Sequence, residues 1–338
     1  MLISKKIVYP ILFSIVFISI PWTYLIPNQI YISDQFTLFE KFSSMQLDSD
    51  ILFQERSIFG YLQGETLGKL IIVQIIKFVG LFNAAQYEYI QNIPKSEPVL
   101  VLNNAVIALK IISFFILFIW LKFLFDRMPI YLSIIFLLNP LTLDMTQGIM
   151  LNSLAFTLII LGLMIKQNKF KYFFYFLAPF IHNSALLVLP IIFFYNFISF
   201  MELNKKSVML ILFIVAFVLT ILLYLANSFV LDGSISFGKR LFVSNSDKSF
   251  FFMTFLGITT VQLISNSEYI KNNYVIIQIL ILFVILNFLN PFVFRFIAGF
   301  LPLLVLSIWN LSNDKKVFIY PLWILFTSYL WLMWANLL

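Results

Sequence analysis

Long apolar runs separated by short polar segments recur along most of the chain. Many of the runs are about 20 residues long, the length at which an α-helix crosses the hydrocarbon core of a bilayer. The apolar positions within them are continuous rather than alternating, which favours helices over membrane β-strands. The pattern predicts an all-α, polytopic membrane protein with spans at 7–26, 99–121, 129–145, 147–165, 207–228, 249–265, 274–289, 296–311 and 317–336.

The apolar segment 171–200 is interrupted in its middle by the turn 182–184, His-Asn-Ser, which lies between Pro179 and Pro190. Each half has only about 15 residues, which is short for a full span. We favour a hairpin of two short helices, whose turn would be buried in protein or line a cavity. A single kinked helix is the alternative.

Two segments are predicted to be loops on the outer side of the membrane, within a single membrane domain over 1–338. The larger loop, 27–98, has an excess of acidic residues. Inside it, 67–82 is apolar but carries Lys69 and Lys77 on roughly one side of a helix, which predicts an amphipathic helix at the outer interface. The second outer loop is 229–248.

Composition agrees with the membrane class and excludes several kinds of chemistry. The chain is 62% hydrophobic and 11% charged, whereas a soluble domain carries roughly 25% charged residues. It has no cysteine and one histidine, so disulfides are excluded and a transition-metal site is not expected. No phosphate-binding glycine loop is present, and we predict no cofactor and no nucleic-acid partner.

The distribution of lysine and arginine predicts the orientation. With an interfacial helix at 67–82, a hairpin at 171–200 and a retained first helix, the chain has about eleven membrane helices and a cytoplasmic N-terminus. The net charge of +7 then reflects basic clusters on the cytoplasmic side: Lys5/Lys6, Lys122/Arg127, Lys166/Lys169/Lys171, Lys205/Lys206, Lys271 and Lys315/Lys316.

The same topology places several polar residues at or near the outer face, where charged groups at membrane depth are functional candidates. Arg295 opens a helix after Asn290-Pro291, and its guanidinium suits a phosphate clamp. Lys239 and Arg240, in a glycine-containing loop, suit a diphosphate at the membrane surface. Membrane-interface anchoring and general attraction to lipid headgroups are the alternatives.

His182 is a candidate general base or a hydrogen-bond donor to a phosphate oxygen, because its pKa is near neutral. Gln147 and Asn152 lie on a helix entering the bilayer, and Asp144 fits a helix N-cap. Lys110 lies inside an apolar run, and we expect it to have a buried partner.

Glu55, Arg56 and Asp34 lie in the first outer loop. Glu55 and Arg56 are adjacent and do not face each other on a helix, so each requires its own partner. A solvated carboxylate is the alternative for Asp34.

The stretch "TQGIMLNSLAFTLIILGLMIKQNKFKYFFYFLAPFIHNSALLVLPIIFF" (146–194) resembles the core of EpsG-like, Wzy-type polysaccharide polymerases. That family shows Arg-Gln opening a helix, a lysine-rich turn, and a Phe-His-x-Ser-Ala-Leu block ending in Leu-Pro. Here an isoleucine precedes His182, and Thr146 stands where the family has arginine before Gln147. The "SD" at 33–34 and the late helix with Arg295 are also similar.

The resemblance implies a GT-C-like fold and a glycosyltransferase that joins repeat units of O-antigen or capsule carried on undecaprenyl diphosphate. It would act without a cofactor at the outer face of the bacterial inner membrane, with membrane lipids and a chain-length regulator as further partners. It implies catalytic roles for His182, Arg295 and Arg240. Lys239, Arg56, Glu55, Gln147 and Asp34 would bind substrate, and an acidic residue in the first outer loop activates the acceptor hydroxyl in many lipid-dependent glycosyltransferases. A flippase or transporter, and an O-antigen ligase, are the alternatives.

Overall fold

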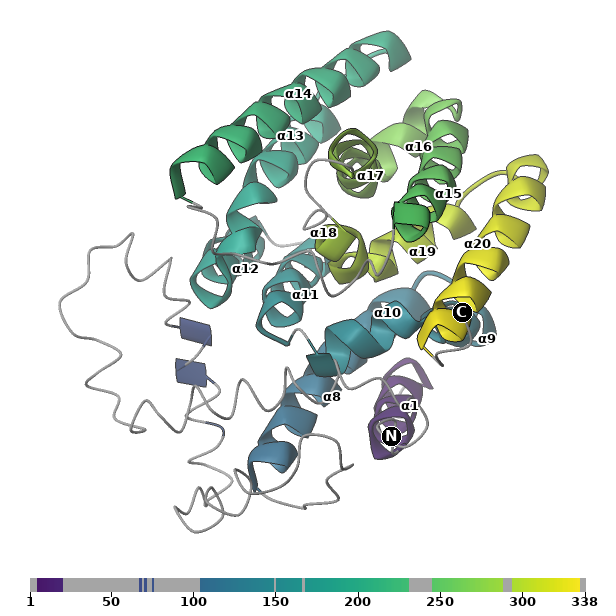
Figure 1. Ribbon diagram of the computed structural model, residues 1–338. Helices are drawn as coiled ribbons and strands as arrows, with labels where there is room; N and C mark the ends of the chain where they lie inside the picture. Colours follow the sequence, from purple (N-terminus) through teal and green to yellow (C-terminus); the bar gives the residue numbers. More distant parts are fainter. Residues whose placement is uncertain are drawn as a thin grey trace, which may run out of the picture. The chain divides into compact units, whose positions relative to one another are not determined.

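The computed structural model describes residues 5–20, 67–68, 70–71, 75, 104–148, 150–165, 168–230, 245–287 and 294–334. Every regular element in these ranges is helical, which confirms the all-α class (Figure 1). The chain divides into two compact units, Met1–Leu186 with Trp331–Leu338, and Leu187–Leu330. Each unit is described by itself.

The first unit is built around α11 (Met150–Met164), which packs against α8 (Asn104–Phe125) and α12 (Asn168–Ile181), while α1 (Lys5–Ser19) packs against α8. Phe13 of α1 and Phe125 of α8 meet edge to face, with ring centroids 6.1 Å apart. The indole of Trp120 in α8 donates to the hydroxyl of Thr157 in α11 at 3.0 Å. α8 and α11 are therefore joined by a polar contact within an apolar interface.

The predicted span 129–145 is broken. It forms α9 (Ile130–Leu137) and α10 (Pro140–Leu143), because Asn139 caps α10 by accepting from the backbone N–H of Leu141 and Pro140 cannot continue α9. Asn139-Pro140 therefore stops a helix, as predicted. Asp144 follows α10 in helical conformation and begins a π-helical segment, Asp144–Gly148, and the N-cap role of its carboxylate stays a prediction.

Side chains from two neighbouring helices stabilise this π-helical segment. Ser113 of α8 donates to the carbonyl of Thr146, and Ser153 of α11 donates to the carbonyl of Met145. The hydroxyl of Thr146 donates to the carbonyl of Thr142 at 2.6 Å. A π-helical turn disturbs the regular backbone hydrogen bonding and leaves carbonyl groups that need other donors. The hydroxyl groups supply these donors and so stabilise the turn that precedes α11.

The second unit surrounds α17 (Tyr274–Leu286), which is buried from Tyr274 to Phe283. The helices that pack on it are α13 (Leu189–Phe200), α14 (Lys205–Val230), α15 (Asn245–Leu263), α16 (Ser267–Asn272), α18 (Phe294–Gly299) and α19 (Leu301–Trp309). Phe255 of α15 packs edge to face against Phe283 of α17 and Phe326 of α20 (Asn313–Trp334), each with centroids 5.1 Å apart. The predicted span 296–311 is divided between α18 and α19, with the break at Phe300.

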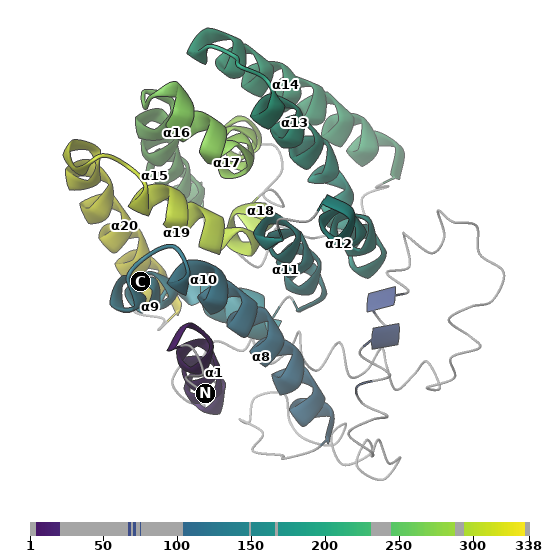
Figure 2. The same ribbon diagram turned by 180° about the vertical axis from the view of Figure 1, so that it is seen from behind.

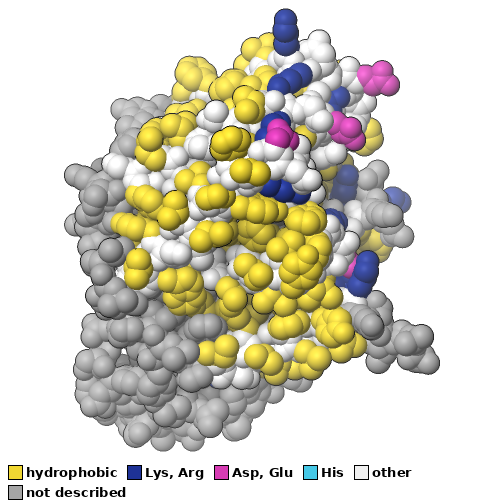
Figure 3. Space-filling model, turned by 90° about the vertical axis from the view of Figure 1, so that its right-hand side faces the viewer, with side chains coloured by type: hydrophobic (Ala, Val, Ile, Leu, Met, Phe, Trp, Pro, Cys, Tyr) yellow, Lys and Arg dark blue, Asp and Glu magenta, His cyan; other side chains and the backbone are white. Residues whose placement is uncertain are grey.

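Two lysines that the sequence assigns to the cytoplasmic side of the membrane, one in α16 and one in α20, form hydrogen bonds to other segments of the second unit. Lys271 donates to the carbonyl of Met201 at 3.4 Å, and Lys315 donates to the hydroxyl of Ser265 at 2.9 Å. Nearby, burial raises the pKa of the Tyr269 phenol, which donates to the carbonyl of Ser307. In the view of Figure 3, hydrophobic side chains cover a broad area and charged side chains gather apart from it.

Within the part of the chain that the structure describes, three helical segments are long and apolar enough to cross a membrane: Asn183–Phe200, Lys205–Leu222 and Asn313–Met333. A fourth results if Pro140–Thr146 and Leu151–Met164, bent by 101°, form one span. Several further apolar helices are shorter. Among the described residues, this supports a membrane protein, while the total of about eleven helices stays a prediction.

Candidate functional site

The candidate site lies at the break between α12 and the next helix, where the sequence places its histidine. Pro179 is inside α12, and the helix ends at Ile181. A 3₁₀ turn, Asn183–Leu187, follows and leads into α13 (Figure 2). The backbone N–H of Ala185 donates to the carbonyl of His182 at 3.1 Å. The structure confirms that 171–200 is interrupted at His182, and the hairpin arrangement stays a prediction.

Three side chains meet at this break. The Nδ1 atom of His182 lies 2.7 Å from the hydroxyl of Ser184 and 3.2 Å from the backbone nitrogen of the same residue. The hydroxyl of Ser184 lies 2.6 Å from Oδ1 of Asn152, which comes from the first turn of α11. His182, Ser184 and Asn152 form the polar cluster on which the site is based.

The polar cluster is enclosed in the first unit. The exposed fraction is 1% for Asn152 and 3% for Ser184, while His182 is partly exposed. Burying an amide and a hydroxyl in an apolar interior is unfavourable unless they find hydrogen-bond partners. Among the described residues, Nδ2 of Asn152 has none. The imidazole of His182 is therefore partly exposed on one side and contacts buried polar side chains, those of Ser184 and Asn152, on the other.

The beginning of α11 connects the polar cluster to the π-helical segment. Ser153, which fixes that segment, is next to Asn152 in the sequence. Gln147 belongs to the π-helical segment, and its backbone is described but its side chain is not. π-helical turns inserted in helices are frequent at functional sites. The turn and the polar cluster are thus two unusual features at one end of α11.

Part of the predicted amphipathic helix packs beside His182. Residues 67, 68, 70, 71 and 75 are helical, and Gly68 is buried. A Cβ added at Gly68 would lie 2.5 Å from the carbonyl oxygen of Ile181 and 2.8 Å from Leu151. Only glycine permits this approach without a shift. This part of 67–82 therefore contacts protein at the end of α12, and Lys69 and Lys77 lie outside the described residues.

The structure places the other predicted site residues only in part. Arg295 is the second residue of α18 in the second unit, and its side chain is not described. Five further candidates lie outside the described residues: Arg240, Lys239, Arg56, Glu55 and Asp34. The predicted outer loop 229–248 is described only at its ends, where α14 runs to Val230 and α15 begins at Asn245. A cavity shared by His182 and the arginines remains a prediction.

The expectation of a buried partner for Lys110 is wrong. Lys110 lies in the second turn of α8, and its side chain is exposed. The helix begins at Asn104, so the lysine is close to a helix end. A long side chain at that depth extends to the aqueous interface.

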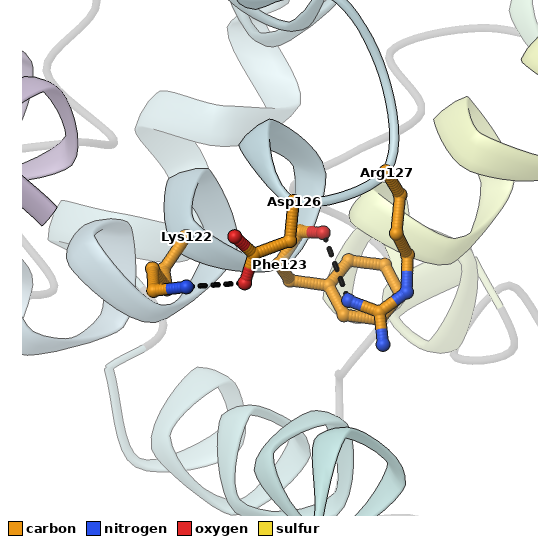
Figure 4. Close-up of polar contacts among 4 residues, drawn as sticks. All are labelled: Lys122, Phe123, Asp126 and Arg127. Carbon is orange, nitrogen blue, oxygen red and sulfur yellow. Dashed lines mark hydrogen bonds and ion pairs between the residues drawn. The ribbon is translucent and has the colours of Figure 1, made fainter. Parts of the chain in front are cut away.

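Charged side chains at the other end of α8 are held by local contacts (Figure 4). Lys122 forms an ion pair with Asp126, one helical turn later. Arg127 donates to the carbonyl of Phe123 at 3.1 Å and lies over its ring, 4.3 Å from the centroid. These contacts account for the cluster without a ligand. Among the described residues, no group of three or more His, Cys, Asp or Glu side chains could hold a metal ion.

Sequence reasoning singles out His182 and notes Asn152 on a helix entering the bilayer, but it assigns no role to Asn152 or Ser184. Ser184 is two positions after the histidine, so a hydrogen bond from its backbone is a local signal that the sequence offers. Asn152 lies 32 positions before Ser184, and only the packing of α11 on α12 brings them together. No protein-family model, no curated protein and no solved structure matches the chain.

Proposed function

We propose that the protein is a Wzy-type polymerase, a glycosyltransferase that extends a polysaccharide on a lipid carrier. The donor is an oligosaccharide linked to undecaprenyl diphosphate, and the acceptor is a lipid-linked repeat unit. The observation that carries the proposal is the imidazole of His182, held by Ser184 and buried Asn152 at a helix break in an apolar unit. That block of sequence also carries the resemblance to the family.

The chemistry suits a membrane-embedded site. The acceptor hydroxyl attacks the anomeric carbon, the bond from that carbon to the diphosphate oxygen breaks, and its electron pair stays on the diphosphate. The proton of the hydroxyl passes to a base. Donors and fixed positive charge stabilise the developing negative charge best where water is excluded. Because both substrates are anchored in the same membrane, proximity lowers the barrier further.

Each candidate residue receives a role in this proposal. Arg295 and Arg240, with Lys239, hold the diphosphate because guanidinium groups match phosphate oxygens in a bidentate way. His182 contacts the reacting groups. Four residues bind the sugar portion or the acceptor: Glu55, Arg56, Gln147 and Asp34.

The proposal includes a topology and a location. In this proposal the protein has a GT-C-like arrangement of about eleven membrane helices. It lies in the bacterial inner membrane, with the site on the outer side. Membrane lipids accommodate the undecaprenyl tail between helices. A chain-length regulator is the further partner.

Depleting the protein in its native host tests the proposed function. We expect surface glycan that carries a single repeat unit, because transport and final attachment continue while extension stops. Gel electrophoresis of the surface glycan measures this. Complete loss of surface glycan would instead indicate a flippase or a ligase and would contradict the polymerase.

Substitutions test the site. We expect His182→Ala and Arg295→Ala each to lower chain extension by about 10²–10³-fold, the usual loss when one donor to a developing anion is removed. Glycan length in complemented cells and rates with purified protein measure this. Asn183→Ala, in the same turn but exposed, and Arg127→Ala, at the end of α8, are the matched controls. Full-length polymer from the first two variants, present at normal levels in the membrane, would remove those residues from the mechanism.

A further inference from the structure

We propose that Ser184 and Asn152 hold His182 in the tautomer that carries its proton on Nε2, so that the ring acts as a hydrogen-bond donor rather than as the general base. Ser184 and Asn152 are then positioning residues. The tautomer is argued from the geometry of the polar cluster alone. The role of the Nε2–H group toward a substrate oxygen rests on the proposed function.

The first step concerns a donor whose proton position is fixed. The backbone N–H of Ser184 points at Nδ1 of His182, with the two nitrogens 3.2 Å apart. A backbone amide always donates, and its hydrogen cannot rotate away. Nδ1 must therefore be the acceptor, because an N–H facing another N–H would be repulsive. In a neutral imidazole the other nitrogen, Nε2, then carries the proton.

The second step concerns which neighbour receives the single proton of the Ser184 hydroxyl. Its oxygen lies 2.7 Å from Nδ1 of His182 and 2.6 Å from the side-chain amide of Asn152. One hydroxyl proton serves only one of these contacts, and the other partner must donate to the oxygen. Either His182 donates to Ser184 and Ser184 to Asn152, or Asn152 donates to Ser184 and Ser184 to His182.

The third step chooses between these two chains of hydrogen bonds. The backbone N–H of Ser184 is compatible only with the second chain, in which Nδ1 of His182 accepts. That chain requires the amide of Asn152 to present its NH₂ group to Ser184. The oxygen and nitrogen of an asparagine amide are assigned from their hydrogen bonds. Turning the amide gives Nδ2 a partner and leaves Oδ1 in the position that has none among the described residues; an underused buried acceptor is less rare in proteins than an unpaired N–H.

The consequence is that the donor and the general base of the reaction are different groups. Nδ1 of His182 carries no proton and already accepts a hydrogen bond. Nε2 carries the proton and can donate it in a hydrogen bond to a substrate oxygen. The oxygen that gains negative charge during sugar transfer is the one that leaves with the diphosphate. His182 stabilises it through a hydrogen bond without losing its proton, and a different group accepts the proton of the attacking hydroxyl.

The chain offers a direct test because it contains one histidine. Labelling all histidine with ¹⁵N gives a single imidazole, and protonated and bare ring nitrogens resonate far apart. In the full-length protein in lipid, at about pH 8.5, well above the ordinary histidine pKa, we expect a proton on Nε2 and a bare Nδ1. A proton on Nδ1 in the wild-type protein would overturn the proposal.

Variants test which residues set the tautomer. Asn152→Asp places a carboxylate, which only accepts, beside the hydroxyl of Ser184. The hydroxyl must then turn to Asp, so Nδ1 stays bare but keeps only the hydrogen bond from the backbone N–H of Ser184. The ¹⁵N signal of Nδ1 should therefore shift, and an unchanged signal would contradict the role of Asn152. Asn183→Asp adds the same charge in an exposed neighbouring position and should leave Nδ1 bare. Asn152→Leu and Ser184→Ala should also leave it bare, because the backbone N–H of residue 184 remains.

A second readout tests the role of the Nε2–H group separately. The side-chain amide of Gln donates a hydrogen bond from a position similar to Nε2, but it cannot act as a base. We expect His182→Gln to recover most of the chain extension that His182→Ala loses. Equal loss in both variants would reject the donor role while leaving the tautomer intact. Full activity in both would reject the proposed function of His182.

Discussion

Gln262 and Gln278 carry the same amide into the apolar interior of the second unit, but they are satisfied differently. Both are fully buried. Nε2 of Gln262 donates to the hydroxyl of Ser307 at 2.8 Å, while its Oε1 has no partner among the described residues. Neither side-chain polar atom of Gln278 has a partner among the described residues. A buried amide without partners costs free energy, whereas a partnered one contributes to stability.

We expect Gln278→Leu to raise the free energy of unfolding by about 1–3 kcal/mol, because it removes an unpaired polar group at similar volume. Gln262→Leu should lower it by about 1 kcal/mol or more, since it leaves the hydroxyl of Ser307 without that donor. Thermal unfolding of the two purified variants in detergent measures the difference. A loss of stability in Gln278→Leu would show that its amide binds a group in the folded protein.

The contacts of a single residue can be predicted from the sequence when its partners are close along the chain, and less well when they are far apart along the chain. The break at His182 is local, and the polar turn between two prolines predicts it. The expected buried partner of Lys110 is wrong, because the side chain is exposed and an apolar run does not show which face of its helix is covered. The contact between Ser184 and Asn152 spans 32 positions and depends on how two helices pack, which apolar patterning does not specify.

Gly162 allows α11 and α12 to approach each other closely. A Cβ at this position would overlap Cε1 of Tyr175 and would lie 3.2 Å from the carbonyl oxygen of Lys171. Small residues at helix interfaces in membranes bring backbones together in this way. The same pair of helices supplies Asn152 and the end of α12, so their spacing determines the distance from Asn152 to Ser184.

Gly162→Ala should separate α11 from α12 and lower the free energy of unfolding by about 1–3 kcal/mol, the usual cost of overpacking. Thermal unfolding measures the loss, and the ¹⁵N signal of His182 should shift as the helices move. Gly257→Ala is the matched control. Its Cβ would meet only the end of the Leu322 side chain, at 3.1 Å, which can move. Equal stability of the two variants would contradict a special role for Gly162.

At the scale of elements, the apolar runs predict where helices lie better than where they break. The interruption at Asn139-Pro140 is visible in the sequence, because proline cannot continue a helix and asparagine caps one. The break at Phe300 also has a signal in the sequence, because Gly299 ends α18 and Pro302 lies in the first turn of α19; the single span predicted at 296–311 does not take it into account. Apolar residues suit both an unbroken span and two short buried helices.

At the scale of the whole molecule, the proposed function depends on which side of the membrane each loop occupies. α14 contains the segment Lys205–Leu222, which is long enough to cross the bilayer. Lys271 contacts the segment just before α14 and Lys315 contacts the segment just after α15, and both lysines are predicted to be cytoplasmic. In the sequence, Lys239 and Arg240 follow the other end of α14.

Because the chain contains no cysteine, single cysteines report sidedness without a background. We expect Ser236→Cys, in the sequence between α14 and α15, to react with a membrane-impermeant maleimide added outside intact spheroplasts. Glu202→Cys, exposed before α14, should react only after the membrane is opened. Mass-tag gel shifts measure both. Reaction of both from outside, or the reverse pattern, would contradict the proposed orientation.

The enclosure of α17 has a consequence for how the protein tolerates its lipid environment. This helix has 13 residues, or about 20 Å at 1.5 Å per residue, less than the roughly 30 Å of a hydrocarbon core. A lipid-facing helix of that length would suffer hydrophobic mismatch. Because neighbouring helices surround α17 along most of its length, its ends need not match the bilayer. Changes in acyl-chain length should therefore act on the long exposed helices α14 and α20 and leave this central helix largely unaffected.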